Sequence, residues 1–123
     1  MEFGIGRSEF FLGGWLKSTE NEQWVGVYLR MGGPHATAHF ELLRQQREEI
    51  EQALGRLDWR APTIDRREPI VQLFRRDADP SQQENWPNQI DWMVSTLEGF
   101  DRTFRPRLKS LDASDWRPGD LTT

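Results

Sequence analysis

Two histidines stand at a spacing that could hold a metal ion. His35 and His39 are four residues apart, which places both imidazoles on one side of a helix if the segment is helical. A metal site needs further ligands, and the nearby acids, such as Glu41, follow no ligand pattern. His39 also borders the apolar stripe of this segment. We therefore interpret the pair as the start of a helix and predict neither a metal nor a cofactor.

Three aspartates could form an acidic cluster of the kind that binds Mg²⁺. They are Asp77, Asp79 and Asp91, and a metal-dependent nuclease would combine such carboxylates with a lysine on a strand. Neither of the two lysines in the chain stands in that context. The pair Asp79-Pro80 is typical of a turn. We predict no catalytic residue and favour a protein that is not an enzyme.

The segment 24–31 alternates between apolar residues and a second set that is aromatic or basic, which predicts a strand with two different faces. The face expected in the core comprises Val25, Val27, Leu29 and Met31. The other face carries Trp24, Tyr28 and Arg30, and we expect Gln72 and Phe74 beside them. Aromatic rings stack on bases and arginines hold phosphates, but the same composition is enriched at protein interfaces. The residues predicted to bind a partner are Trp24, Tyr28, Arg30, Arg60, Arg75 and Arg76.

A sheet face this rich in aromatic residues is rarely left exposed to water in a monomer. The cover is either a binding partner or a part of this chain, namely the N-terminal segment or the tail around Trp116. The stretch 56–76 holds six arginines against three acids and could form a local basic surface. The net charge of the whole chain is -4, which argues against non-specific nucleic-acid binding by the entire molecule.

The rest of the chain supplies the elements that position these residues. Apolar periodicities of two and of roughly 3.6 residues, broken by Gly and Pro, predict strands and helices in the order ββαββα. The predicted strands span 9–16, with a bulge at Gly13-Gly14, and 24–31, 57–60 and 70–75. The predicted helices span 34–54 and 87–111, the second with a kink or restart at Pro106. The resulting fold is α+β, a four-stranded and mainly antiparallel sheet with two long helices on one face.

Length and composition set further limits. With 123 residues the chain is one domain, which we place at residues 1–112, followed by a polar tail at 113–123. It has no cysteine, so disulfides and thiolate metal sites are excluded. No apolar run approaches the ~20 residues of a membrane helix, and the N-terminus has no signal-peptide pattern. We expect a cytoplasmic protein with no membrane partner.

Three stretches carry a family resemblance: Asp79-Pro80, Trp86-Pro87-x-Gln89-x-x-Trp92 and Phe104-Arg105-Pro106-Arg107. Together with shorter matches between residues 5 and 112, they resemble the prokaryotic domain of unknown function 4268 family. Members often follow an endonuclease-like domain in mobile-element settings, so the resemblance implies nucleic-acid metabolism or host–phage conflict. The family has no agreed catalytic residues to carry over. These residues include no such nuclease domain, so either the domain stands alone or the sequence is a fragment of a longer protein, and we assign no nuclease activity.

Three hypotheses of function follow from these residues. The first is a non-catalytic interaction domain of a prokaryotic nuclease or defence system, which docks through its aromatic and arginine-rich sheet face. Its partner would be another protein, a second copy of the chain or nucleic acid. The second is a small metal-dependent nuclease that uses Asp77, Asp79 and Asp91. The third is a phage-type inhibitor of a host defence system, whose acidic surface mimics nucleic acid.

Overall fold

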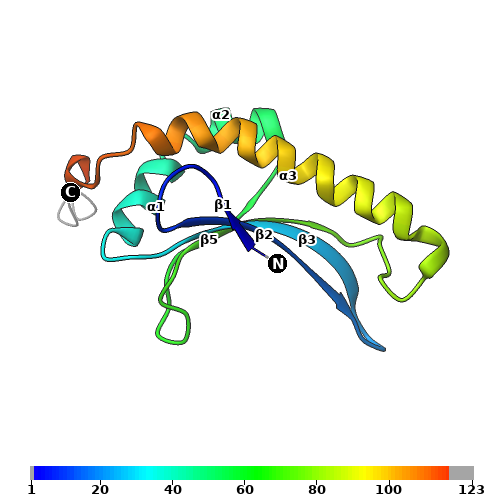
Figure 1. Ribbon diagram of the computed structural model, residues 1–123. Coiled ribbons are helices and arrows are strands. Elements are labelled where there is room, and N and C mark those ends of the chain that lie inside the picture. Colours follow the sequence, from blue (N-terminus) through cyan, green and yellow to red (C-terminus); the bar gives the residue numbers. More distant parts are fainter. Residues whose placement is uncertain (1, 117–123) are drawn as a thin grey trace.

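The computed structural model, which describes residues 2–116, is an α+β fold with one antiparallel sheet and a layer of helices (Figure 1). The strands are β1 (Glu2–Gly4), β2 (Phe10–Ser18), β3 (Gln23–Met31), β4 (Asp58–Arg60) and β5 (Ile70–Arg75), in the spatial order β1-β2-β3-β5-β4. The helices are α1 (Ala36–Arg44), α2 (Arg47–Leu54) and α3 (Trp86–Lys109), with short 3₁₀ turns η1 (Gln83–Asn85) and η2 (Ala113–Asp115). All three α-helices lie on one side of the sheet, above it in Figure 1.

The predicted four-stranded sheet is corrected to five strands. The additional strand is β1, which pairs antiparallel with β2 through Glu2 opposite Gly13, Phe3 opposite Leu12 and Gly4 opposite Phe11. A strand of three residues with a glycine at its end carries no readable period, and it is held by the ladder to β2. The antiparallel arrangement and the placement of the helices on one face agree with the prediction.

Alternation along β3 separates the core from the opposite face as expected. Val25, Val27, Leu29 and Met31 are all at most 1 % exposed. Across the sheet, Leu12 lies opposite Leu29, which in turn lies opposite Val71, so one row of aliphatic side chains joins three strands. On β5 the core-facing residues are therefore Val71 and Leu73, and Gln72 and Phe74 point away from the helices.

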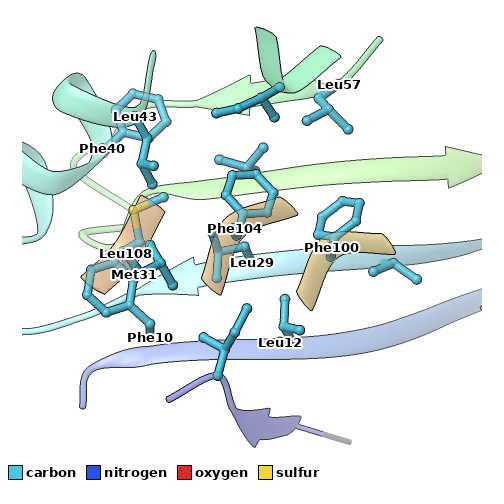
Figure 2. Close-up of a cluster of buried hydrophobic side chains, with 14 of the residues drawn as sticks. Phe10, Leu12, Leu29, Met31, Phe40, Leu43, Leu57, Phe100, Phe104 and Leu108 are labelled. Atoms are coloured by element: carbon cyan, nitrogen blue, oxygen red, sulfur yellow. The ribbon is translucent and has the colours of Figure 1, made fainter. Parts of the chain in front are cut away.

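The core forms between this face and the helices. Figure 2 shows Phe100, Phe104 and Leu108 of α3 lying among side chains of the strands and of α1. The predicted stripe of α3 is only partly buried, because the side chains of Phe100 and Phe104 are inaccessible whereas that of Ile90 is 55 % exposed. The N-terminal half of α3 therefore keeps an apolar surface that the fold does not cover.

The predicted bulge at Gly13-Gly14 is wrong. Gly13 pairs with Tyr28 and Gly14 with Val27 in an unbroken register. Gly14 instead makes room for a side chain of α3: a Cβ there would lie 2.5 Å from Cε at the end of the flexible Met93 side chain.

The structure divides the first predicted long helix and keeps the second one continuous. The first is divided into α1 and α2 at Gln45–Gln46, so that Phe40 and Leu43 pack toward the sheet while α2 packs against α3. No Gly or Pro marks this break in the sequence. The second helix runs on without a restart through Pro106. That ring lies on the exposed side of α3, and the buried residues around it, Phe104 and Leu108, hold the helix on the core.

Neither candidate cover from the chain closes the far side of the sheet. Trp116 follows η2, which packs against α1 in the helix layer. The segment β1 instead extends the sheet at its edge. The last residues of the predicted tail, 117–123, lie outside the described residues. Within 2–116, no helix is both long and apolar enough to cross a membrane.

Candidate functional site on the open sheet face

Trp15 and Phe74 stack across a glycine on the sheet face that no helix covers. Trp15 on β2 and Phe74 on β5 both pair with Gly26 of the intervening strand β3. Their ring centroids are 6.4 Å apart and their planes differ by only 6°. A Cβ on Gly26 would lie 2.9 Å from Phe74 and 3.0 Å from Trp15. The glycine therefore provides the space in which the two rings meet.

Two more aromatic side chains complete what we call the aromatic cluster: Trp15, Trp24, Tyr28 and Phe74. Trp24 stands edge-on to both stacked rings, with centroid distances of 6.1 Å to Trp15 and 4.8 Å to Phe74. Tyr28 lies 4.7 Å from Trp15 between ring centroids. Trp15 remains 38 % exposed. Trp24 and Phe74 are half-buried and Tyr28 is buried, so the accessible part of the cluster is formed by Trp15, Trp24 and Phe74. Rings packed in this way form a preorganised apolar surface, since they are fixed before any partner arrives.

The loop 61–69 and the tip of the β2–β3 hairpin bound the open face at its two ends. In Figure 1 both extend below the sheet, away from the helices. The loop carries Ile64, whose side chain is 97 % exposed. The face is therefore bordered at one end by an apolar side chain that the fold itself does not use.

A polar network adjoins the aromatic cluster. The Tyr28 hydroxyl donates to Glu2 Oε2 at 2.8 Å, and Arg30 donates to both carboxylate oxygens of Glu2, at 2.8 and 2.9 Å. Arg30 also pairs with Glu68. The guanidinium of Arg30 lies over the ring of Phe11, 4.4 Å from its centroid. Three segments distant in sequence are thus tied together around one arginine.

This network shifts the pKa values of Glu2, Tyr28 and Arg30. The hydrogen bond from Arg30 is the main reason that the pKa of Glu2 falls to about 2. Burial, and then the hydrogen bond to Glu2, raise the pKa of Tyr28 to about 12. The pKa of Arg30 rises further above its ordinary value, chiefly through its bond to Glu2. Near neutral pH the network thus holds an ionised carboxylate, a neutral phenol and a guanidinium.

Two further arginines of the face, Arg60 and Arg76, lie beside acids. Arg60 donates to Asp58 at 2.8 Å, and Gln72 donates to the same carboxylate oxygen at 2.8 Å. Arg76 lies over Phe74, 4.9 Å from the ring centroid, and 3.9 Å from a carboxylate oxygen of Glu22. The contribution of these arginines to the field of the surface is therefore largely offset.

The structure brings five of the six predicted binding residues to this face and separates the sixth. Trp24, Tyr28, Arg30, Arg60 and Arg76 lie on the open side. Arg75 does not, because it pairs with the core-facing Val25 and therefore points to the helix side. There it bonds Asp77 at 3.1 Å and lines a polar hollow of about 530 Å³ with residues of the α3 N-terminus. The grouping of Arg75 with Arg76 ignored the two-residue period of a strand.

Sequence reasoning missed two residues of the site. Trp15 was part of a predicted strand but not of the predicted binding set, although alternation from Phe11 through Gly13 to Trp15 places all three on one face. Glu2 had no readable signal, since only the pairing of β1 with β2 brings its carboxylate to Tyr28 and Arg30.

Of the two histidines, His39 lies in the core, whereas His35 is exposed just before α1. His39 is 4 % exposed, and its ring packs 5.1 Å from that of Phe10. Burial lowers the pKa of His39, and the nearby charge of Arg7 adds to this effect. In the described part of the chain, no group of three or more His, Cys, Asp or Glu side chains could hold a metal ion.

The acidic and Trp-Pro stretches form the connection between β5 and α3. Asp79 accepts hydrogen bonds from the backbone N–H and the hydroxyl of Ser81, at 2.9 and 2.7 Å. Trp86 Nε1 donates to the carbonyl of Pro80 at 2.7 Å, and Gln89, which is buried, donates to the carbonyl of Asp79 at 2.7 Å. Asp77 is engaged separately with Arg75. These bonds give the stretches a structural role, the seating of the last helix.

Comparison with known proteins matched one family model. The model described as domain of unknown function 4268 covers residues 1–108. No curated protein and no solved structure matches the chain.

Proposed function

The chain belongs to the domain of unknown function 4268 family, and we propose that it is a non-catalytic interaction domain whose open sheet face docks on another protein. The observation that carries the proposal is the aromatic cluster. Trp15, Trp24 and Phe74 are locked against one another, stand on a face that no described element covers, and remain accessible. Rigid aromatic side chains are the residues that most often dominate binding energy at protein interfaces.

The charges of the face favour a protein over nucleic acid. Binding to a phosphate backbone depends on cations that are free to replace counterions. Arg30 is matched by Glu2 and Glu68, and Arg60 is matched by Asp58. An apolar centre bordered by internally paired charges is the usual anatomy of a protein interface. The partner that fits best therefore presents an apolar centre with a polar rim of mixed charge.

The proposed setting is a prokaryotic nuclease or defence system, in the cytoplasm. What supports it is the resemblance to a family whose members often accompany an endonuclease-like domain. In such a system this domain would recruit or regulate the catalytic protein. The proposed residues of the docking surface are Trp15, Trp24, Tyr28, Arg30, Arg60, Phe74 and Arg76.

Affinity capture with matched variants tests the docking surface. The chain, its Trp15→Ala/Trp24→Ala variant and a Phe3→Ala control would be used to capture partners from a lysate of the source cells. Phe3 is also an exposed apolar residue, but it pairs with the core-facing Leu12 and so lies on the helix side of the sheet. The proposal predicts a protein that is retained by the wild type and the control and lost with the double variant. A partner retained by all three would contradict the proposed surface.

Titration with labelled oligonucleotides tests the alternative ligand. Anisotropy would be followed at low salt with single-stranded and double-stranded probes, for the wild type and for Arg60→Ala/Arg76→Ala. We expect no saturable binding. Saturable binding that the double variant abolishes would replace the protein partner with nucleic acid, and Mg²⁺-dependent cleavage of the probe would contradict the non-catalytic assignment.

A further inference from the structure

Strand β2 has an outer edge that its neighbour covers only in part. The short strand β1 pairs with residues Phe11 to Gly13. Over the next five residues, Gly14 to Ser18, no strand of the described chain pairs with that edge. An unpaired strand edge presents a row of backbone donors and acceptors and is a template for another strand. No proline or bulge protects it, and its one charged residue, Lys17, is drawn back to Glu22 of the same hairpin at 2.9 Å.

An apolar strip runs along this free edge on the helix side. Leu16 is 61 % exposed, and beside it Trp86, Ile90 and Val94 follow one another on α3 at a spacing of about one turn. Leu16, Trp86 and Ile90 line a hollow of about 340 Å³ whose surface is predominantly apolar. We call Leu16, Trp86, Ile90 and Val94 the edge strip. It is separate from the aromatic cluster, which lies on the opposite face.

We propose that two copies of the chain join through this edge, with the two β2 strands antiparallel about a two-fold axis at Leu16. A protein segment can pair with the free backbone edge only as an extended strand, and an antiparallel pairing of identical strands is self-complementary. A two-fold axis normal to the sheet keeps the helices of both copies on one side. The two edge strips then meet and cover each other. This inference does not rest on the proposed docking function.

The register follows from the limits of the edge and from its charges. Centred on Leu16, the pairing uses the whole free stretch, with Gly14 opposite Ser18 of the second copy. Centred on Trp15, it would extend to Gly13, which already pairs with β1. Centred on Lys17, it would set two like charges directly opposite each other, which is unfavourable. In the Leu16 register, Lys17 instead faces Trp15 of the second copy, a favourable cation–aromatic pair.

The dimer would give one continuous sheet with a single open face. Trp15 belongs to both features, because it stands on the free edge and in the aromatic cluster. Joining the two edges therefore places the two aromatic clusters side by side at the seam. A partner with two equivalent epitopes would then bind with avidity.

Mass measurement across concentration tests this inference. Light scattering coupled to gel filtration, and sedimentation equilibrium up to roughly 1 mM chain, would compare the wild type with Leu16→Glu, Ile90→Lys and Ala53→Glu. Leu16→Glu sets two carboxylates opposite each other at the axis and should give a monomer, and Ile90→Lys should weaken the dimer. The control Ala53→Glu adds the same charge to an exposed site on α2 and should remain dimeric.

Hydrogen exchange supplies a second readout. In the dimer, amides of the stretch 15–18 that point outward become protected, and their protection should rise with concentration in the wild type but not in Leu16→Glu. A wild-type chain that is monomeric over the whole range would overturn the proposal and leave the edge to a strand from another protein. A dimer whose mass and exchange are insensitive to Leu16→Glu would also overturn it, because that dimer must use another surface.

Discussion

Trp15 and Phe74 lie in parallel planes on two strands that do not pair with each other, and they meet only because Gly26 stands between them. This relationship links the fold to the proposed function. The stacking that stabilises the sheet also gives its open face a rigid aromatic surface. A substitution at Gly26 should therefore change both the packing of the aromatic cluster and the stability of the fold.

Gly26→Ala should destabilise the protein. The added Cβ would lie within 3.0 Å of both aromatic rings, so Trp15 and Phe74 must separate. We expect a loss of about 1–3 kcal/mol in the free energy of unfolding, the usual cost of overpacking. Urea unfolding measures it, with Gly4→Ala as the control because a Cβ at Gly4 meets no atom within 4 Å. Equal stability of the two variants would show that the rings adjust freely.

The ion pair of Glu2 should contribute to acid sensitivity. The pKa of Glu2 is lowered from 4.5 to about 2, mainly by Arg30. The stabilisation from its ionised form is therefore present above about pH 4.5 and is lost as the pH falls toward 2. Because the pair is partly exposed, we expect about 1 kcal/mol rather than the full linkage value. Unfolding curves at neutral and acidic pH should differ less for Glu2→Gln than for the wild type, with Glu20→Gln behaving like the wild type.

Tyr28 should lose its proton only at an unusually high pH. It is the one tyrosine of the chain, so the phenolate absorbance reports its titration without overlap from another tyrosine. Burial and Glu2 hold its pKa at about 12. The stabilisation that comes with the neutral phenol is complete below the ordinary value of 10.0 and is lost as the pH rises through 12. Glu2→Gln should move the midpoint toward lower pH, and a wild-type midpoint at the ordinary value would contradict the network.

Arg7 should stabilise the C-terminal end of α3. Its Nη1 donates to the carbonyls of Leu108, in the last turn of α3, at 2.6 Å and of Leu111, just after the helix, at 2.7 Å. The Leu108 carbonyl otherwise has only a longer bond of 3.3 Å from the backbone N–H of Leu111. The positive charge of Arg7 also suits the negative end of the helix dipole. We expect Arg7→Ala to cost about 1–3 kcal/mol in thermal or urea unfolding and Arg7→Lys to cost less. The control is Arg102→Ala, because Arg102 is exposed. An equal loss of stability in both alanine variants would contradict the proposed capping by Arg7.

Much of the architecture could be read from local pattern. The alternation of β3 separates Val25, Val27, Leu29 and Met31 from Trp24, Tyr28 and Arg30, and the structure confirms this division. The bounds of β5 were predicted as 70–75 and are observed there. The periodic stripe of α3 identified the helix and its buried residues Phe100 and Phe104. These features repeat at the period of the element itself, so a short stretch of sequence contains the whole signal.

Other features depended on contacts between distant segments. The strand β1 exists through its ladder to β2, the break between α1 and α2 accommodates packing on two different neighbours, and Glu2 reaches Arg30 only across the sheet. Sequence suggested that Gly13-Gly14 is a bulge, whereas in the structure the register is unbroken there and Gly14 lies against the Met93 side chain. The order of residues along each strand determined which apolar, aromatic and charged side chains share a face. The tertiary structure alone decided which strands are neighbours, and therefore that Trp15, Gly26 and Phe74 form one row, because that order is set by pairing across the sheet and not by distance along the chain.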